Sequence, residues 1–226
     1  MSLRNLKVVL VITLFALCTG VAGFGDPCGV TNQLACSNWD GGSNLFASQN
    51  DTVAGNGNFA TTYEQFTLPG GVFGYSVESF HWVGGYFNPP AAGTITKWTL
   101  DFYADNSGAP GASVWSKAFP GNPSETFIGN VKGFPIYDYS VSFPNAAVAP
   151  GTYWASVVPD LGFPPQWGWA TGVGGNGYQC FFGSCGSAGG GFAFAVDGKV
   201  VPEPGSLLLL GTGLLGLAGA LRRKLL

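Results

Sequence analysis

The chain has 226 residues, of which 46% are hydrophobic and 9% are charged, and its formal net charge is −3. Between residues 24 and 200 the imbalance is larger, because eleven acidic residues stand against four lysines and no arginine. Nucleic-acid binding needs clustered cations that displace phosphate counterions, and arginine is the usual reader of phosphate and guanine, so this composition excludes nucleic acid as a partner.

Residues 1–23 have the three parts of a secretory signal peptide. A short basic region with Arg4 and Lys7 precedes an apolar run, and small residues follow before the expected cleavage point. Cys18 follows Leu17, whereas a lipoprotein signal has a small residue immediately before its modified cysteine, so the lipoprotein alternative is rejected. We therefore expect signal peptidase to remove residues 1–23 from an exported protein.

Residues 24–200 are long enough for one domain with its own core. Apolar and polar residues alternate along this region, and no window shows helical spacing for three turns. In the segment 95–105, for example, Trp98, Leu100 and Phe102 share one face of a half-buried strand. Further strands are expected at residues 63–68, 75–83, 112–119, 137–143, 151–158, 166–170 and 192–196.

The segments between these strands are rich in residues that form tight turns, such as Leu68–Gly71 and Asp105–Gly108. About eight short strands with such turns predict an all-β fold, a single antiparallel β-sandwich of jelly-roll-like type. Residues 24–60 are too polar and glycine-rich to assign. The predicted regions are a signal peptide at 1–23, the exported sandwich domain at 24–200 and a C-terminal tail at 201–226.

Removal of the signal peptide takes away Cys18 and leaves Cys28, Cys36, Cys180 and Cys185. An even number of cysteines in an exported chain indicates disulfides. Three pairings are possible, and we expect the one with the shortest loops, which joins Cys28 to Cys36 and Cys180 to Cys185. The spacing lacks the C-x2-C pattern that is usual in zinc sites, so no metal site is expected.

No motif between residues 24 and 200 establishes an enzyme. His81 is the only histidine, so a serine triad or a histidine-rich metal centre would depend on it alone. The G-x-G-x-x-G matches at 172–177 and 211–216 lack the strand-to-helix context of a dinucleotide site. The turn after Asp105 is a weak calcium candidate, and a side-chain-capped turn is favoured there. Glycoside hydrolysis needs two facing carboxylates, and the candidates are Glu64, Glu78, Asp101, Asp105, Glu125 and Asp138.

All seven tryptophans lie between residues 24 and 200. Trp167 and Trp169 fall on the same face of an expected strand with a glycine between them, and Trp82 and Tyr86 are placed to extend that surface. Exposed ring pairs of this kind stack on sugar rings, which makes these four residues candidate glycan contacts. Burial in the core is the competing interpretation, and it is the commoner use of large aromatic side chains.

The tail begins with residues that cannot continue regular structure. Pro202 and Pro204 flank Glu203, and each proline removes a backbone donor and restricts the residue before it. These three residues therefore predict an extended hinge that a processing enzyme can reach.

An apolar run and a basic cluster follow the hinge. The run at residues 207–221 would form about 22 Å of helix, which is short for a hydrocarbon core of about 30 Å, so a short transmembrane segment is expected. The cluster consists of Arg222, Arg223 and Lys224, and its positive charge keeps it on the cytoplasmic side of a membrane. The domain before the tail would then face away from the cytoplasm.

This order of proline-flanked glutamate, apolar run and basic cluster resembles the PEP-CTERM sorting signal of exported bacterial proteins. The resemblance is confined to the tail. It implies that a membrane-embedded exosortase recognises the tail and cuts near residues 202–204, after transient anchoring in the inner membrane. An ordinary C-terminal anchor does not need these residues, and a eukaryotic lipid-anchor signal does not normally end in a basic triplet.

Together these features predict an exported protein of the cell surface or extracellular matrix. Its domain is expected to be structural or to interact with carbohydrate, in association with extracellular polysaccharide or biofilm, and without a cofactor. The alternative is a secreted polysaccharide-degrading enzyme, either a glycoside hydrolase or a lyase. A cleft with two carboxylates would favour the enzyme, whereas exposed Trp167 and Trp169 without such a cleft would favour binding.

Overall fold

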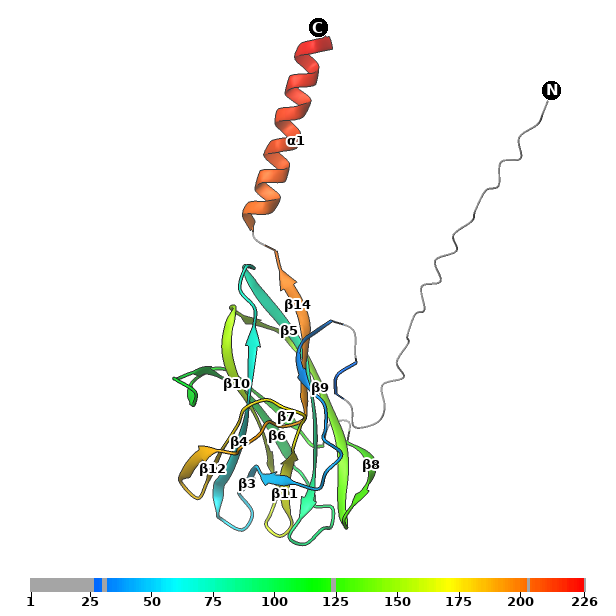
Figure 1. Ribbon diagram of the computed structural model, residues 1–226, viewed down its shortest axis with the longest axis vertical. Helices are drawn as coiled ribbons and strands as arrows, with labels where there is room; N and C mark the ends of the chain where they lie inside the picture. The colour runs from blue at the N-terminus through cyan, green and yellow to red at the C-terminus, as the bar shows by residue number, and fades with distance from the viewer. Residues whose placement is uncertain (1–26, 30–31, 123–124, 203, 226) are drawn as a thin grey trace, which may run out of the picture.

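Two β-sheets of seven strands each account for most of the chain in the computed structural model, which describes residues 27–29, 32–122, 125–202 and 204–225 (Figure 1). The predicted signal peptide lies outside these ranges. The first sheet contains β1 (Gln33–Ser37), β2 (Leu45–Ala47), β5 (Gly74–Phe87), β8 (Thr126–Val131), β9 (Phe134–Val148), β11 (Gln166–Ala170) and β14 (Phe194–Val201). The second contains β3 (Gln49–Asp51), β4 (Gly57–Leu68), β6 (Lys97–Asp105), β7 (Pro110–Pro120), β10 (Gly151–Asp160), β12 (Gly177–Phe181) and β13 (Ser184–Ser187).

Strand pairing is antiparallel throughout the described chain except for one short parallel contact between β3 and β10. The first sheet has the order β1-β14-β5-β11-β2, with β9 beside β5 and β8 beside β9. The second has the order β13-β12-β4-β3-β10-β6-β7. The predicted all-β, antiparallel fold is therefore confirmed.

All eight expected strands are present, and β11 has the predicted bounds. The structure adds six more strands, β1, β2, β3, β8, β12 and β13, each of which has at most six residues. Such short strands contain too few alternations to stand out in a sequence, and several of them lie at sheet edges where both faces are partly wet.

The core lies between the two sheets and is largely aromatic. On β6, Trp98, Leu100 and Phe102 are buried as predicted, because every second residue of the strand faces the opposite sheet. The ring centroid of Trp98 lies 5.1 Å from that of Trp82 on β5 and 4.8 Å from that of Trp167 on β11. Edge-to-face contacts of this kind stabilise a core beyond the burial of apolar area alone.

Strand β4 runs the length of the sandwich and defines its two ends. At one end, which we call the tail end, Leu68 pairs with Gly151, Val148 pairs with Tyr75, and Val201 at the end of β14 pairs with Gly74. At the other, which we call the far end, β4 begins beside the β12–β13 hairpin, where Ala60 pairs with Phe181. The twelve residues of β4 separate the two ends by about 36 Å at a rise of about 3.3 Å per residue.

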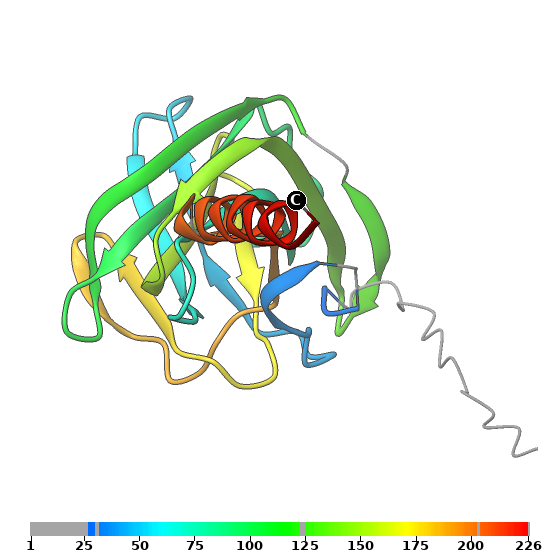
Figure 2. The ribbon, with the colours of Figure 1, turned by 90° about the horizontal axis from the view of Figure 1, so that it is seen from above.

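The predicted helix of the tail is present as α1 (Pro204–Leu225), which projects from the tail end beyond β14 (Figures 1 and 2). The hinge is expected at residues 202–204, but Pro204 already belongs to α1, so the link is one residue shorter than predicted. Proline fits the first turn of a helix, where its missing N–H has no helical partner. In the part of the chain that the structure describes, no helix is long and apolar enough to cross a membrane. Glu203 lies outside the described residues.

Both predicted disulfides are present. Cys28 is bonded to Cys36, and Cys180 to Cys185. The bonds close loops with sequence separations of 8 and 5 residues, and loops of this size stabilise a folded chain by about 2 kcal/mol each in the chain-entropy model. The first ties the chain around β1, and the second bridges the two strands of the β12–β13 hairpin.

Candidate functional site

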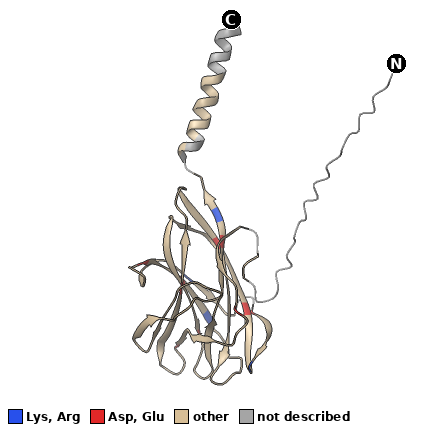
Figure 3. Ribbon diagram, viewed as in Figure 1, with Lys and Arg blue, Asp and Glu red and all other residues tan. Residues whose placement is uncertain are grey.

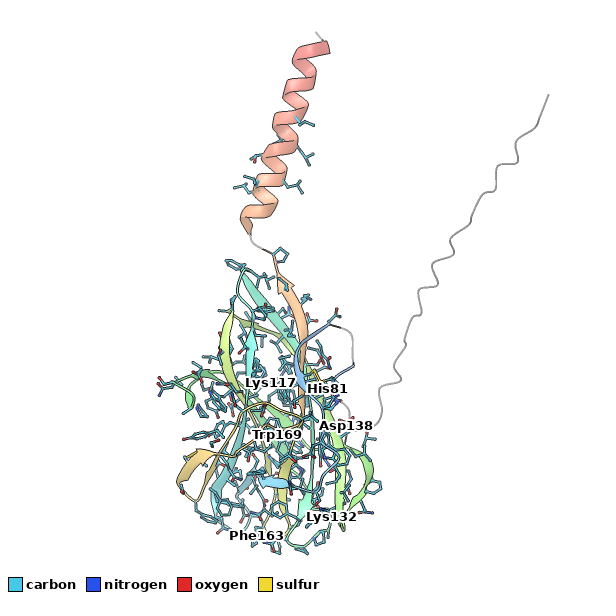
Figure 4. The ribbon with its side chains drawn as sticks, viewed as in Figure 1. His81, Lys117, Lys132, Asp138, Phe163 and Trp169 are labelled. Carbon is cyan, nitrogen blue, oxygen red and sulfur yellow. A yellow bond between two sulfur atoms is a disulfide. The ribbon has the colours of Figure 1, made fainter. Side chains whose placement is uncertain are left out.

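The four candidate glycan contacts are buried, so the interpretation that they stack on sugar rings is wrong and the competing core interpretation holds. Trp82, Trp167, Trp169 and Tyr86 are at most 1% exposed. Trp167 and Trp169 do share one face of β11, but that face points at the second sheet, and Trp169 lies inside the sandwich in Figure 4. The indole N–H of Trp169 donates a hydrogen bond of 2.8 Å to the carbonyl oxygen of Ala193. The core interpretation is confirmed.

The opposite face of β11, at Gly168, is not an open platform either. A Cβ atom at this glycine would come within 2.9 Å of the Phe87 ring and 3.0 Å of Leu45. Side chains therefore cover both faces of β11. The glycine leaves room for its neighbours and does not expose a flat surface.

The polar tips of the core aromatics converge on Glu125. The hydroxyls of Tyr86 and Tyr139 each donate a hydrogen bond of 2.8 Å to Glu125 Oε1, and Trp167 Nε1 donates one of 3.1 Å to the Tyr139 hydroxyl. Burial is the main cause of the raised pKa of both tyrosines, and the adjacent carboxylate adds to it, so both stay protonated as donors. This carboxyl is committed to the core and is a poor candidate for acid catalysis.

Glu64 is a buried acid at the centre of the second sheet. It is 1% exposed, and its Oε2 accepts a hydrogen bond of 2.7 Å from the Phe192 amide. Gly175 and Gly191 lie so close that a Cβ at either position would clash with Oε1. Burial raises the pKa of Glu64 to about 9, so the group is neutral at pH 7. It fills a cradle of glycine backbone and has no room for a substrate.

Asp105 caps the β6–β7 turn, as the favoured prediction for this turn required. Its Oδ2 accepts a hydrogen bond of 3.2 Å from the Gly108 amide, and its Oδ1 accepts one of 2.7 Å from Trp154 Nε1 and one of 3.0 Å from Gln65. The Trp154 hydrogen bond is the main cause of the lowered pKa of Asp105. These partners use the carboxylate oxygens that a calcium ion would need.

His81 does not pair with a nucleophile in the way that a serine triad requires. Its Nε2 lies 3.0 Å from Asp197 Oδ2, and the Ser79 hydroxyl donates to that same oxygen at 2.9 Å. The serine therefore bonds to the acid and not to the imidazole. Asp138 lies on the same side of the first sheet (Figure 4), and its pKa is raised by burial although His81 opposes the shift.

The remaining carboxylate candidates have partners of their own. Lys199 contacts Glu78, and burial raises the pKa of Asp101 although Ser116 and Tyr103 donate hydrogen bonds to it. The six candidates thus belong to separate local networks in the described chain.

A group of four phenylalanines at the far end was not recognised in the sequence. Phe59 lies at its base with 7% exposure, and Phe163, Phe181 and Phe182 surround it with exposures of 38%, 41% and 66%. The Phe59 ring centroid is 5.1 Å from Phe182, 6.0 Å from Phe181 and 6.4 Å from Phe163. Figure 4 shows Phe163 at the end of the sandwich remote from α1. We call these residues the far-end phenylalanine cluster.

The disulfide of the β12–β13 hairpin holds two of these rings. Cys180 and Cys185 are paired across the hairpin and bonded, and Phe182 and Gly183 form its two-residue turn with φ angles of 45° and 81°. Such a turn requires left-handed backbone at both positions, which a phenylalanine adopts at a cost. The covalent clamp keeps Phe181 and Phe182 in place on the surface.

Three hollows adjoin the cluster, with volumes of about 180, 240 and 370 Å³, and all three are lined by Phe181. None of their lining residues is charged, and Figure 3 shows how thinly acidic and basic residues are spread over the sandwich. Aromatic rings and side-chain amides dominate the lining, namely Phe46, Phe59, Phe87, Phe163, Phe181 and Phe182 with Asn56, Asn88, Gln166 and Gln179. This end offers apolar ring faces beside neutral donors and acceptors.

At the tail end, the predicted sorting residues lie directly beside the folded sheet. Val201 is still paired with Gly74, Pro202 is exposed, and α1 begins two residues later. The leucines of α1 whose side chains are described are 61% to 77% exposed. The structure does not describe the side chains of the basic cluster, Arg222, Arg223 and Lys224.

Residues 200–224 match the model of the PEP-CTERM protein-sorting motif, which confirms the resemblance. The comparisons with curated proteins and with solved structures found no match. The matched segment contains the hinge, the apolar helix and the basic cluster in the predicted order. The chain is therefore an exported protein whose C-terminus carries a PEP-CTERM protein-sorting motif, the signal for exosortase processing.

Proposed function

We propose that the exported domain is a non-catalytic module that binds a neutral polysaccharide through its far end. Signal peptidase removes residues 1–23, exosortase processing follows, and the mature domain acts at the cell surface or in the extracellular matrix. The observation that carries this proposal is the far-end phenylalanine cluster, with two exposed rings on a disulfide-clamped hairpin.

An exposed aromatic cluster on a rigid support favours a binding role. Exposed apolar side chains do not contribute the stability that buried ones do, and contiguous apolar patches on a surface commonly mark interaction sites. Phe182 is 66% exposed and adopts a backbone conformation that glycine or asparagine would adopt at lower cost. A disulfide fixes this arrangement before any ligand arrives, which lowers the entropy lost on binding.

The chemistry of the hollows fits a sugar chain without charge. A hexose ring has an apolar C–H face, which suits Phe181 and Phe182, and hydroxyls at its rim, which suit the amides of Asn88 and Gln166. A polysaccharide with carboxylate groups would find no cation among the lining residues. The domain as a whole is acidic, so it would repel such a chain.

Affinity electrophoresis of the full chain in gels containing a neutral glucan, a mannan or a polyuronate tests this proposal. We expect retardation by a neutral polymer and none by the polyuronate. Phe182→Ala should weaken binding about tenfold, as expected for a truncated contact of about 1.4 kcal/mol. Phe127→Ala is the matched control, because Phe127 is 53% exposed on β8 and lies outside the cluster.

Two results would overturn the proposal. One is equal retardation of Phe182→Ala, Phe127→Ala and the parent chain. The other is turnover of the polymer, detected as new reducing ends, which would establish the enzyme instead.

A further inference from the structure

We propose that the tail end of the sandwich is a membrane-contacting surface, which rests in the lipid headgroup layer while the sorting tail anchors the precursor. The contact is made by the β4–β5 turn at 69–73, the β9–β10 turn at 149–150 and the last residues of β14. This inference rests on the membrane anchoring of the precursor and is independent of glycan binding at the far end.

The residues at this end are uncharged and partly apolar. Neither turn nor the segment 200–202 contains an acidic or basic residue. Phe73 is 61% exposed and Val200 is 47% exposed. An apolar hollow of about 220 Å³ adjoins Phe73, and its lining also includes Val148 and Val201. Exposed apolar side chains of this kind gain free energy on entering the interfacial region of a bilayer.

Both turns are held rigidly by tyrosines. The Tyr75 hydroxyl donates a hydrogen bond of 2.8 Å to the carbonyl oxygen of Pro69, and the Tyr153 hydroxyl donates one of 3.0 Å to that of Ala149. In each case a side chain on the strand after the turn binds the backbone at its start. The turns therefore present Phe73 and its neighbours in a fixed position.

The short link between the sandwich and α1 identifies the bilayer as the occupant of this surface. Strand β14 ends at Val201 and α1 begins at Pro204, so only residues 202 and 203 separate them. Three extended Cα-to-Cα steps reach about 10 Å at most. The headgroup layer on each side of a bilayer is roughly 5–7 Å thick. When α1 is held in the membrane, the link therefore keeps the tail end within about 5 Å of the headgroup layer, which a phenylalanine side chain can span.

The far end serves as an internal control for this surface. It also exposes phenylalanine, but Phe182 packs on Phe59 near the start of β4, and the tail end lies beyond Leu68 at its other end. Nine residues of strand place the two about 30 Å apart. A membrane that touches Phe73 is therefore out of reach of Phe182.

Fluorescence quenching in vesicles tests the contact. The full chain is reconstituted in phosphatidylcholine vesicles whose acyl chains are brominated near the headgroups, and the emission added by Phe73→Trp or by Phe182→Trp is measured against the parent chain. We expect about twofold quenching of the emission added by Phe73→Trp, because a ring at the headgroup–acyl boundary lies close to bromine. The emission added by Phe182→Trp should be unchanged. Val200→Trp is the second tail-end variant, in case Phe73→Trp does not fold.

Vesicle flotation in the same samples separates the two possible failures. A chain that does not float with the vesicles would overturn both the anchoring and the contact. A chain that floats while its tail-end and far-end variants are quenched equally would overturn the contact and leave the anchoring in place.

Discussion

The two ends of the sandwich expose the same kind of side chain in different surroundings. Phe73 at the tail end sits among uncharged turns that tyrosine hydroxyls hold in place. Its neighbour Gly74 pairs with Val201, and α1 with its exposed leucines begins at Pro204. Phe182 at the far end sits on a disulfide-clamped hairpin beside hollows lined by amides. An exposed ring alone therefore says little about function. The groups around it distinguish a surface for lipid from a surface for a polar ligand.

In the core between the two ends, the aromatic side chains are buried and pack against one another. Trp98, Trp82 and Trp167 meet edge to face and are at most 1% exposed. Their role is to hold the sheets together. Substitutions in the core should therefore change stability, and substitutions at the ends should change binding or sorting.

The largest expected effect is at the sorting motif. Replacing Pro202, Glu203 and Pro204 by alanine should abolish processing in a host that has an exosortase, because it removes the recognised groups and lets helix extend toward β14. Intact-mass measurement and membrane fractionation would find uncut protein in the membrane. The parent chain should lose everything beyond residues 202–204, and secreted parent protein that still carries residues 207–226 would contradict the assignment.

The next largest effect is in the core. Trp167→Ala should lower the free energy of unfolding by about 3–5 kcal/mol, because it leaves a cavity against Trp98 and removes a donor to Tyr139. Urea denaturation measures the change. Phe182→Ala is the control and should alter stability by less than about 0.5 kcal/mol. A loss below about 1 kcal/mol in Trp167→Ala would mean that the ring is not core.

Glu64 should make stability depend on pH. Its pKa is raised from 4.5 to about 9 in the folded chain, so the folded state holds a proton that the unfolded state releases. The stabilisation is complete below about pH 4.5 and is lost as the pH rises toward 9. The free energy of unfolding of Glu64→Gln, measured relative to that of the parent chain, should therefore rise by on the order of 2–4 kcal/mol between pH 5 and pH 8. Denaturation measurements that give the same difference in unfolding free energy between variant and parent at both pH values would contradict this.

The smallest expected effect on stability comes from removing the hairpin disulfide, and this variant tests the far end alone. Replacing Cys180 and Cys185 by serine should lower the free energy of unfolding by about 2 kcal/mol and loosen the turn that holds Phe182. Neutral-glycan affinity should fall with it. The matched variant at Cys28 and Cys36 should lose similar stability and keep its glycan affinity. Equal loss of affinity in both variants would show that the hairpin has no special role.

Alternation made the sandwich predictable, since Trp98, Leu100 and Phe102 had to share a face. It could not say whether the ring face of β11 points into the core or into solvent, which is why Trp167 and Trp169 became glycan candidates. Burial depends on the partner sheet, and here Trp98 of the second sheet packs against Trp167. The local disulfides were predictable because loop length alone favours them.

The far-end phenylalanine cluster could not be assembled from the sequence. Phe59 lies near the start of β4, Phe163 follows β10, and Phe181 ends β12, so only the tertiary fold brings them together. Two adjacent phenylalanines inside a short cysteine loop, at residues 180–185, were the available signal. The sorting motif, by contrast, is read from contiguous residues and needs no fold to be recognised.

The most direct test of the difference between the two ends is hydrogen exchange of the full chain with and without the neutral polysaccharide that retards it. Binding at the far end predicts slower exchange of the amides in the β12–β13 hairpin and the segment around Phe163. The same account predicts unchanged exchange in the β4–β5 turn that carries Phe73. Protection at the tail end, or glycan binding without any protection of the hairpin, would contradict it.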